Sequence, residues 1–267
     1  MKRRPAVAGQ FYSAGTSALS KQVAGFIKSG EAVEKAVGIV SPHAGLVYSG
    51  AVAGAVYSKI EFPNTFVLIG PNHTGLGMPV SVMTSGKWEM PTGSLEIDEV
   101  FAGKLLKRSE AFKEDSSAHL MEHSLEVQLP FIIYFSSDVK IVPVTIMTDS
   151  VDSCRLIGEA VADVVKDTEY SVTIAASSDM THYEKDSVAR VKDKQAIDRI
   201  TALDPEGLYE TVLKNDISMC GYAPVTAMLY AAKKLGAKKA ELVKYMTSGE
   251  VSGDYDSVVG YAGIIIK

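Results

Sequence analysis

The stretch TFVLIGPNHTG, residues 65–75, joins an apolar run to a cluster of turn-forming residues that contains one histidine. The apolar part has no charged side chain on either side of an extended chain, which is typical of a strand covered on both faces of a sheet. Pro, Asn and Gly then favour a turn. In open α/β sheets, ligands bind beyond the carboxyl ends of the strands. His73 therefore lies where such folds place their chemistry.

Five other apolar runs rich in Val and Ile predict strands, at 36–41, 139–146, 170–177, 240–246 and 257–266. Helical spacing between them predicts helices at 149–165, 186–200, 204–215 and 223–236, and at 122–135 with an end or kink at Pro130. Residues 78–98 hold β-formers, Pro and Gly and predict a β-excursion. Alternating strands and helices predict one α/β domain over 1–267, with a mostly parallel or mixed central sheet flanked by helices on both faces.

The composition excludes several classes of protein. The net charge of −5 gives no basic excess, so a nucleic-acid partner is not expected. No apolar run reaches the length of about 18 residues that a membrane span needs, so no membrane association is expected either. The two cysteines, Cys154 and Cys220, form no disulfide framework and favour a reducing, cytoplasmic location. The sequence leaves the oligomeric state open.

Three of the five histidines follow predicted strands directly, in GIVSPHAG (38–45), VLIGPNHTG (67–75) and TIAASSDMTHY (173–183). A single histidine at such a place is usually a loop residue bonded to backbone. If the three strands are parallel, however, His43, His73 and His182 all face one crevice. We therefore expect these three imidazoles to converge on a single site.

Such a site suits a divalent metal, which two imidazoles and a third carboxylate or thiolate ligand can hold. Asp179 either orients His182 as a catalytic dyad or caps the following turn. Cys220 precedes the helix expected from Ala223, where a lowered thiol pKa would favour the metal-binding thiolate. The alternative is that Cys220 is a small buried apolar residue, which is the reading adopted for Cys154.

The segment HLMEH (119–123) matches the inverted zincin pattern, in which His119 and His123 bind zinc and Glu122 is the general base. This short pattern has many chance matches, and the neighbouring SSA (116–118) predicts an exposed loop for His119. Motifs for dinucleotide binding, P-loop nucleotide binding and the α/β-hydrolase nucleophile are absent from the sequence.

Motifs along most of the chain resemble the MEMO family: RPAVAGQFYS, SPHAGLVYSG, IGPNHTG, MPTGSLEID, EHSLEVQLPF, SSDMTHY, MCGYAPV and TSGEVSGDYDSVVGYAGI. That family is similar in fold to the class III extradiol, LigB-type, ring-cleaving dioxygenases, which use non-haem iron. The resemblance implies a LigB-like α/β domain with a central sheet flanked by helices.

The same resemblance implies roles for individual residues. His43 and His73 match the two histidine ligands of the dioxygenases, and Cys220 stands where those enzymes carry a glutamate. His182 matches their catalytic base, with Asp179 beside it. Further residues are expected in the pocket or behind the ligands: His123, Tyr48, Asn72, Glu122, Tyr183 and Tyr222.

The thiolate makes the implied site softer than a two-histidine, one-carboxylate site, and it is itself oxidisable. The expected cofactor is a divalent metal, foremost Fe(II), with copper or zinc as alternatives. One hypothesis is a dioxygenase-like redox enzyme acting on a small molecule. The other is a non-catalytic protein that handles metal or binds a peptide in the same pocket.

Overall fold

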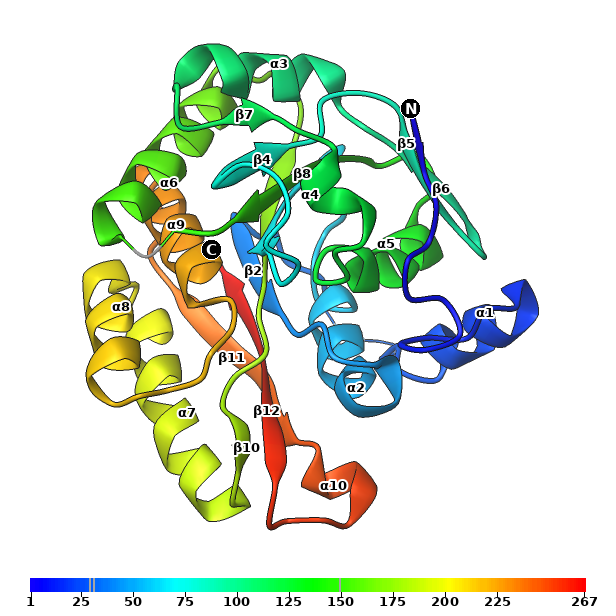
Figure 1. The fold of residues 1–267 in the computed structure, drawn as a ribbon, viewed down its shortest axis with the longest axis vertical. Helices are drawn as coiled ribbons and strands as arrows, with labels where there is room; N and C mark the ends of the chain where they lie inside the picture. The colour runs from blue at the N-terminus through cyan, green and yellow to red at the C-terminus, as the bar shows by residue number, and fades with distance from the viewer. Residues whose placement is uncertain (29, 31, 149) are drawn as a thin grey trace.

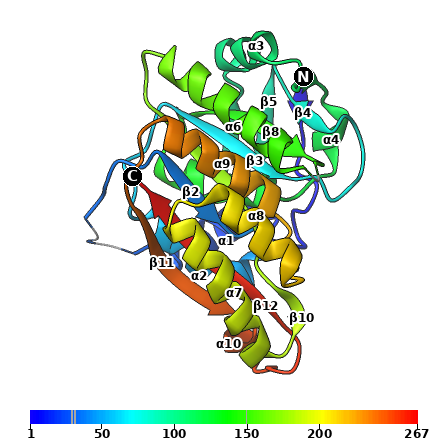
Figure 2. The same cartoon turned by 90° about the vertical axis from the view of Figure 1, so that its left-hand side faces the viewer.

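The stretch TFVLIG lies in strand β3 (Thr65–Pro71), inside the main sheet of the computed structural model. Figure 1 shows the whole fold, and β3 is labelled in Figure 2. The structure describes residues 1–28, 30, 32–148 and 150–267. Within these residues the main sheet has nine strands. Its order is β10 (His182–Glu184), β12 (Val258–Ile266), β2 (Gly38–Ser41), β9 (Val172–Ser177), β3, β8 (Lys140–Ile146), β4 (Val80–Val82) and β7 (Lys113–Glu114), and β11 (Ala240–Thr247) pairs with β12.

The centre of this sheet is parallel. Strands β2, β9, β3 and β8 run in the same direction, and the register pairs Ser41 with Ser177 and Pro71 with Ile146. The carboxyl ends of these strands therefore meet at one edge. Strands β12 and β4 flank the parallel centre in antiparallel orientation, so the sheet is mixed, as predicted.

Both faces of the central strands of the sheet are buried, which explains why these strands are continuous apolar runs in the sequence. Side chains of β3 alternate between two cores: Val67 and Ile69 enter one, and Phe66 and Leu68 enter the other. Residues of four helices pack into the first core: α6 (Val151–Lys166), α7 (Asp186–Thr201), α8 (Pro205–Lys214) and α9 (Tyr222–Lys234). These helices lie in front of the sheet in Figure 2. The second contains α1 (Thr16–Ala24), α2 (Leu46–Tyr57) and α5 (Leu129–Phe135).

The six predicted strands and the four helices α6 to α9 all form. The helix predicted over 149–165 begins at Val151, after Ser150, whose side chain accepts a hydrogen bond from the Ser153 amide. Asp149, its first predicted residue, lies outside the described residues. The helices that the prediction omitted are α1, α2, α3 (Glu99–Arg108), α4 (Ser117–Leu120) and α10 (Gly249–Ser252).

The segment 78–98 is mostly β, as predicted, but it divides between two sheets. Strand β4 joins the main sheet, while β5 (Lys87–Met90) and β6 (Gly93–Glu96) form a separate sheet with β1 (Lys2–Arg3).

The prediction for Pro130 was wrong. It neither ends nor kinks a helix, because it lies in the first turn of α5, where its missing N–H has no helical partner to lose. A 3-10 turn, η1 (Glu126–Gln128), precedes that helix.

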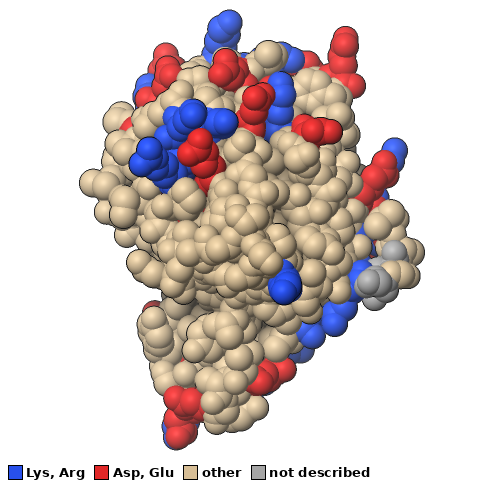
Figure 3. All heavy atoms as spheres, turned by 90° about the vertical axis from the view of Figure 1, so that its right-hand side faces the viewer, with Lys and Arg blue, Asp and Glu red and all other residues tan. Residues whose placement is uncertain are grey.

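In the described chain, no helix combines the length and the apolar composition that a membrane crossing requires. On the face shown in Figure 3, basic and acidic side chains lie beside each other at the upper end, and the centre of the face is largely uncharged. That face therefore does not concentrate positive charge.

Candidate metal centre

A cavity of about 520 Å³ lies where the parallel strands end. Four imidazoles line it, from His43, His73, His123 and His182, together with the thiol of Cys220. His43 follows β2, His73 follows β3, and His182 begins β10 after the end of β9. The sequence-based expectation that the three strand-end histidines share one pocket is thus met by the geometry.

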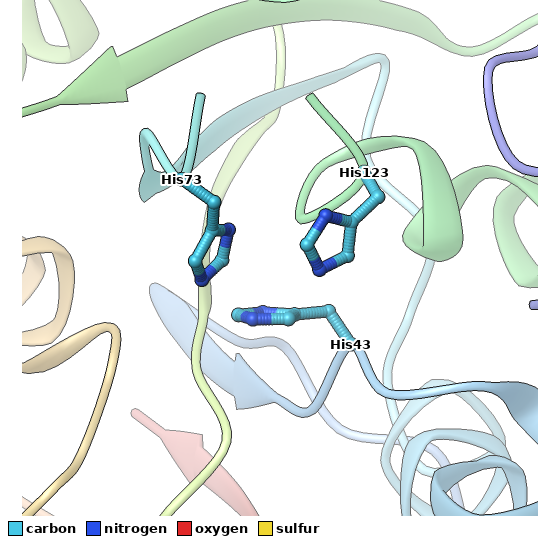
Figure 4. A group of neighbouring side chains, drawn as sticks. All are labelled: His43, His73 and His123. Carbon is cyan, nitrogen blue, oxygen red and sulfur yellow. The ribbon is translucent and has the colours of Figure 1, made fainter. Parts of the chain in front are cut away.

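Three of these rings point toward one another (Figure 4). Their candidate ligand nitrogens, on His43, His73 and His123, all lie within 4.8 Å of one another. The His73 and His123 rings stack at 4.6 Å between centroids, and His43 meets both edge-on at 5.3 and 5.5 Å. His123 was expected in the pocket or behind the ligands, and the structure places its ring in the pocket, beside those of His43 and His73.

Glu122 orients His73. Its Oε1 lies 2.9 Å from His73 Nδ1, and its Oε2 accepts a hydrogen bond from the His73 amide. A carboxylate can only accept here, so Nδ1 carries the proton and Nε2 keeps its lone pair. Burial acts to raise the Glu122 pKa, but the hydrogen bond from His73, its electrostatic interaction with the carboxylate and the hydrogen bond from the Ser124 amide outweigh it and lower the pKa to about 2.

Ser218 orients His182. Its carbonyl oxygen lies 2.9 Å from His182 Nδ1, and its hydroxyl accepts from the His182 amide. The expected orientation of His182 by Asp179 is not what the structure shows. Asp179 instead accepts from the amides of His43 and Ala44, which fixes the loop after β2 and not the turn that follows Asp179 itself. Burial raises the pKa of the Asp179 carboxyl.

Cys220 lies beside His43, with its Sγ 3.3 Å from His43 Nε2. It precedes α9, as expected, but its pKa is not lowered. Burial, and then the charge of Asp179, raise the pKa of the thiol. The protein without metal therefore holds a thiol at this position. Cys154 is fully buried in α6, which confirms its predicted place in the core.

The donor set fits a transition metal. Burial, followed by the neighbouring imidazoles of His123 and His73, lowers the pKa of His43 well below its ordinary value, so the ring is neutral. Neutral imidazoles whose Nδ1 is anchored by a buried polar group are the usual form of histidine ligands. A thiol next to them adds the softer donor that copper, zinc and iron accept.

Of the other residues expected in or near the pocket, some line the cavity and others do not. Tyr183 lines the cavity and is 78% exposed. Tyr48, in the first turn of α2, and Tyr222, whose ring lies 5.4 Å from that of Tyr209, are outside the described cavity lining. The Asn72 side chain accepts from Thr74 and Gly75 within its own loop, so it shapes the turn that carries His73.

The zincin interpretation of HLMEH is wrong in its geometry. Helix α4 ends at Leu120, so His119 and His123 do not share a helical face. His119 was expected in an exposed loop, yet it is fully buried, 5.9 Å from the Trp88 ring. The carboxylate of Glu122 binds His73 instead.

Several residues of the site could not be predicted from the spacing of motifs in the sequence. Phe11 packs its ring 4.7 Å from His123, and Arg3 donates to the carbonyl of Glu122 while forming a fully buried ion pair with Glu126. These contacts bring the N-terminal segment to the pocket across more than 100 residues of chain. The motif RPAVAGQFYS (4–13) contains Phe11 and begins directly after Arg3, but nothing in it indicates a pocket.

The fold and the pocket define the class: an α/β protein with a histidine-rich site at the carboxyl edge of its parallel strands. The family described as Memo-like protein matches residues 3–265. The chain is 43% identical to a MEMO1 family protein of Methanopyrus kandleri, covering 100% of this chain and 99% of the relative. It is 41% identical to one of Methanothermobacter thermautotrophicus, covering 98% and 99%. The chain belongs to the MEMO family.

A solved structure supports the fold independently. An uncharacterized protein from Escherichia coli K12 matches with a TM-score of 0.56 and 14% identity, over 85% of this chain and 98% of the other. At this identity the likeness concerns the arrangement of helices and strands alone.

Proposed function

We propose that this protein binds a redox-active transition metal in the histidine pocket and uses it in dioxygenase-like chemistry on a small molecule. The observation that carries the proposal is the convergence of four imidazoles and one thiol on a single cavity. Such a set of nitrogen and sulfur donors is the kind that iron, copper and zinc accept. Fe(II) is the metal that the likeness to extradiol dioxygenases favours.

His43, His73 and Cys220 are the proposed ligands. His43 Nε2 and Cys220 Sγ are 3.3 Å apart, and the Nδ1 of His73 is held by Glu122. His123 is near enough to both imidazoles to replace the thiolate as third donor. Binding through sulfur requires loss of the thiol proton, which a bound cation promotes.

His182 is the proposed acid–base group. It lines the same cavity, and its Nδ1 faces the Ser218 carbonyl, so Nε2 can exchange a proton with a substrate. Asp179 supports the site indirectly by holding the loop of His43. A bound metal would supply Lewis acidity and one-electron redox chemistry. The substrate is proposed to be small, and the reduced thiol suits a cytoplasmic protein.

The thiol also favours a second candidate, a metal-handling or peptide-binding protein without turnover. Cys220 places a soft donor where the ring-cleaving enzymes carry a carboxylate, and soft donors hold Cu(I) well. In this case the cavity binds metal or peptide and His182 has no chemical role.

Metal titrations of three variants test the ligand set. We expect Cys220→Ser to lose Fe(II) and Cu(I) affinity by about 10-fold or more, which corresponds to about 1.4 kcal/mol. Cys154→Ser, in the core of α6, is the matched control and should bind as the wild type does. If His123→Ala loses metal while Cys220→Ser retains it, the third ligand is the imidazole.

His182→Ala separates the two functions. An enzyme should keep its metal but lose turnover of catechol-like substrates with dioxygen, because its acid–base group is gone. Equal turnover in wild type and variant would exclude the proposed role of His182. A metal-bound wild type that turns over none of these substrates would favour the binding protein.

A further inference from the structure

The hydroxyl of Ser177, at the end of β9, is the centre of a buried hydrogen-bond group behind His43. Its Oγ lies 2.8 Å from His43 Nδ1, 2.9 Å from Gln128 Nε2 and 2.6 Å from the carbonyl oxygen of Ser124. His43, Gln128 and Ser177 are each at most 2% exposed. A hydroxyl has one proton and two lone pairs, so these three contacts use all of its capacity.

Two backbone carbonyls decide where the protons lie. The Ser124 carbonyl can only accept, so it takes the Ser177 proton. The Gln128 amide atom 2.9 Å from the Pro42 carbonyl must be the nitrogen, because two facing oxygens would repel each other. The same nitrogen then donates its second proton to Ser177. The Tyr57 hydroxyl, 3.1 Å from Gln128 Oε1, completes the amide's hydrogen bonds.

Only one lone pair of the Ser177 hydroxyl remains, and His43 must donate to it. We therefore propose that Ser177 is a positioning residue that holds His43 in the tautomer protonated at Nδ1, with its Nε2 lone pair facing the pocket. In this state the Cys220 thiol, 3.3 Å away, can donate to Nε2. The tautomers of His73 and His182 are set by the Glu122 carboxylate and the Ser218 carbonyl, which can only accept a hydrogen bond from Nδ1. His43 instead faces a hydroxyl, which accepts or donates, so its tautomer depends on the group behind it.

The use of this tautomer rests on the proposed metal site, although the tautomer itself does not. An imidazole protonated at Nε2 has no lone pair to offer a metal in the pocket. Because Ser177 keeps the proton of His43 on Nδ1, the proton does not have to move from Nε2 before a metal binds there. The same hydrogen bond fixes the plane of the ring. Contacts of this kind, behind a ligand, change metal affinity by about 10–100-fold when they are removed.

The neighbouring strand offers a matched control. Ser41 on β2 pairs with Ser177 in the sheet register and is also fully buried. Its hydroxyl has no hydrogen-bond partner among the described residues. Ser41→Ala and Ser177→Ala thus remove the same atom from adjacent buried sites, but only the second removes an acceptor from His43.

The decisive experiment is long-range ¹H–¹⁵N NMR of the histidine rings in metal-free protein, above the pKa of free histidine. The His43 signals are assigned with His43→Gln. We expect Nδ1–H at His43 in the wild type and in Ser41→Ala. In Ser177→Ala a population protonated at Nε2 should appear, and Ser177→Thr, which keeps the hydroxyl, should restore the wild-type pattern.

A wild-type His43 protonated at Nε2 would overturn the proposal without recourse to any variant. So would a Ser177→Ala spectrum identical to that of the wild type, or an equal change in Ser41→Ala.

Co(II) titration then tests the use of the tautomer. We expect Ser177→Ala to weaken Co(II) binding by about 10–100-fold and Ser41→Ala to leave it unchanged. Unchanged affinity in Ser177→Ala would overturn the role of Ser177 in metal binding. A wild type that binds no metal but shows Nδ1–H at His43 would instead refute the proposed function and support the tautomer assignment.

Discussion

His119 shows how much the surroundings of one side chain decide. Sequence reasoning placed it in an exposed loop, because SSA precedes it and no apolar pattern includes it. The fold buries its ring next to Trp88, and Arg3 donates to its carbonyl oxygen. Burial, together with the charge of Arg3, lowers the pKa of His119 to about 4. Packing against two segments distant in the sequence, those of Arg3 and Trp88, creates this environment, so local sequence could not predict it.

This buried imidazole predicts a pH dependence of stability. Between pH 6.5 and about 4, His119 is protonated in the unfolded chain but not in the folded protein. The free energy of unfolding therefore decreases as the pH is lowered through this range. The pKa shift of His119 corresponds to a loss of about 3 kcal/mol in the free energy of unfolding over this pH range. His119→Leu should remove that part of the slope.

Urea unfolding of wild type and His119→Leu at several pH values measures the difference directly. The two curves of unfolding free energy should diverge from each other as the pH falls through this window. Parallel curves would show that His119 stays protonatable in the folded protein.

The residues of the site were predictable only in part, for a physical reason. His43, His73, His182 and Cys220 could be found because a strand end or a helix start, both visible locally, fixes their position. Ser177 could not, because its importance lies in contacts with two other segments. The expected lowering of the Cys220 pKa failed because burial, and then the charge of Asp179, raise the pKa of this thiol.

At the scale of elements, the buried strands were easier to predict than the helices. A strand covered on both faces is apolar throughout, and the runs that form β2, β3, β8, β9 and β12 were all found, whereas the short strands β1, β7 and β10 were not. Helix α2 is also apolar nearly all round, because it packs between the sheet and neighbouring segments, so it shows no helical periodicity. Glycines in it admit Phe26: a Cβ on Gly54 would lie 2.5 Å from the Phe26 carbonyl oxygen.

The contact between α6 and α9 gives a prediction at this scale. A Cβ on Gly158 of α6 would lie 2.1 Å from the carbonyl oxygen of Ala227 in α9. Gly158→Ala should force the helices apart and destabilise the protein by about 1–3 kcal/mol, despite the better helix propensity of alanine.

Gly103 in α3 is the matched control, since a Cβ there meets nothing within 4 Å. Gly103→Ala should stabilise the protein by about 0.5–1 kcal/mol. Chemical denaturation of both variants measures whether each substitution raises or lowers the free energy of unfolding. If both variants were stabilised, α6 and α9 would not be in the close contact that the structure shows.

At the scale of the whole molecule, the chain converges on one edge of its sheet. Parallel strands bring His43, His73 and His182 there, and the loop before η1 adds His123 and Glu122. The N-terminal segment closes the site with Phe11. Alternation of strands and helices was sufficient to predict this edge, whereas the paths of the N-terminal segment and of the loop that carries His123 had no local signature.

The central claim is that this edge binds a metal, and the metal content of protein purified without oxygen tests it most directly. Wild type should be compared with His43→Ala and His73→Ala, and with His119→Ala as a histidine control outside the pocket. The account predicts near-stoichiometric iron or copper in wild type and His119→Ala, lost in the two pocket variants. No bound metal in the wild type, and no uptake of Fe(II), Cu(I) or Zn(II), would contradict it.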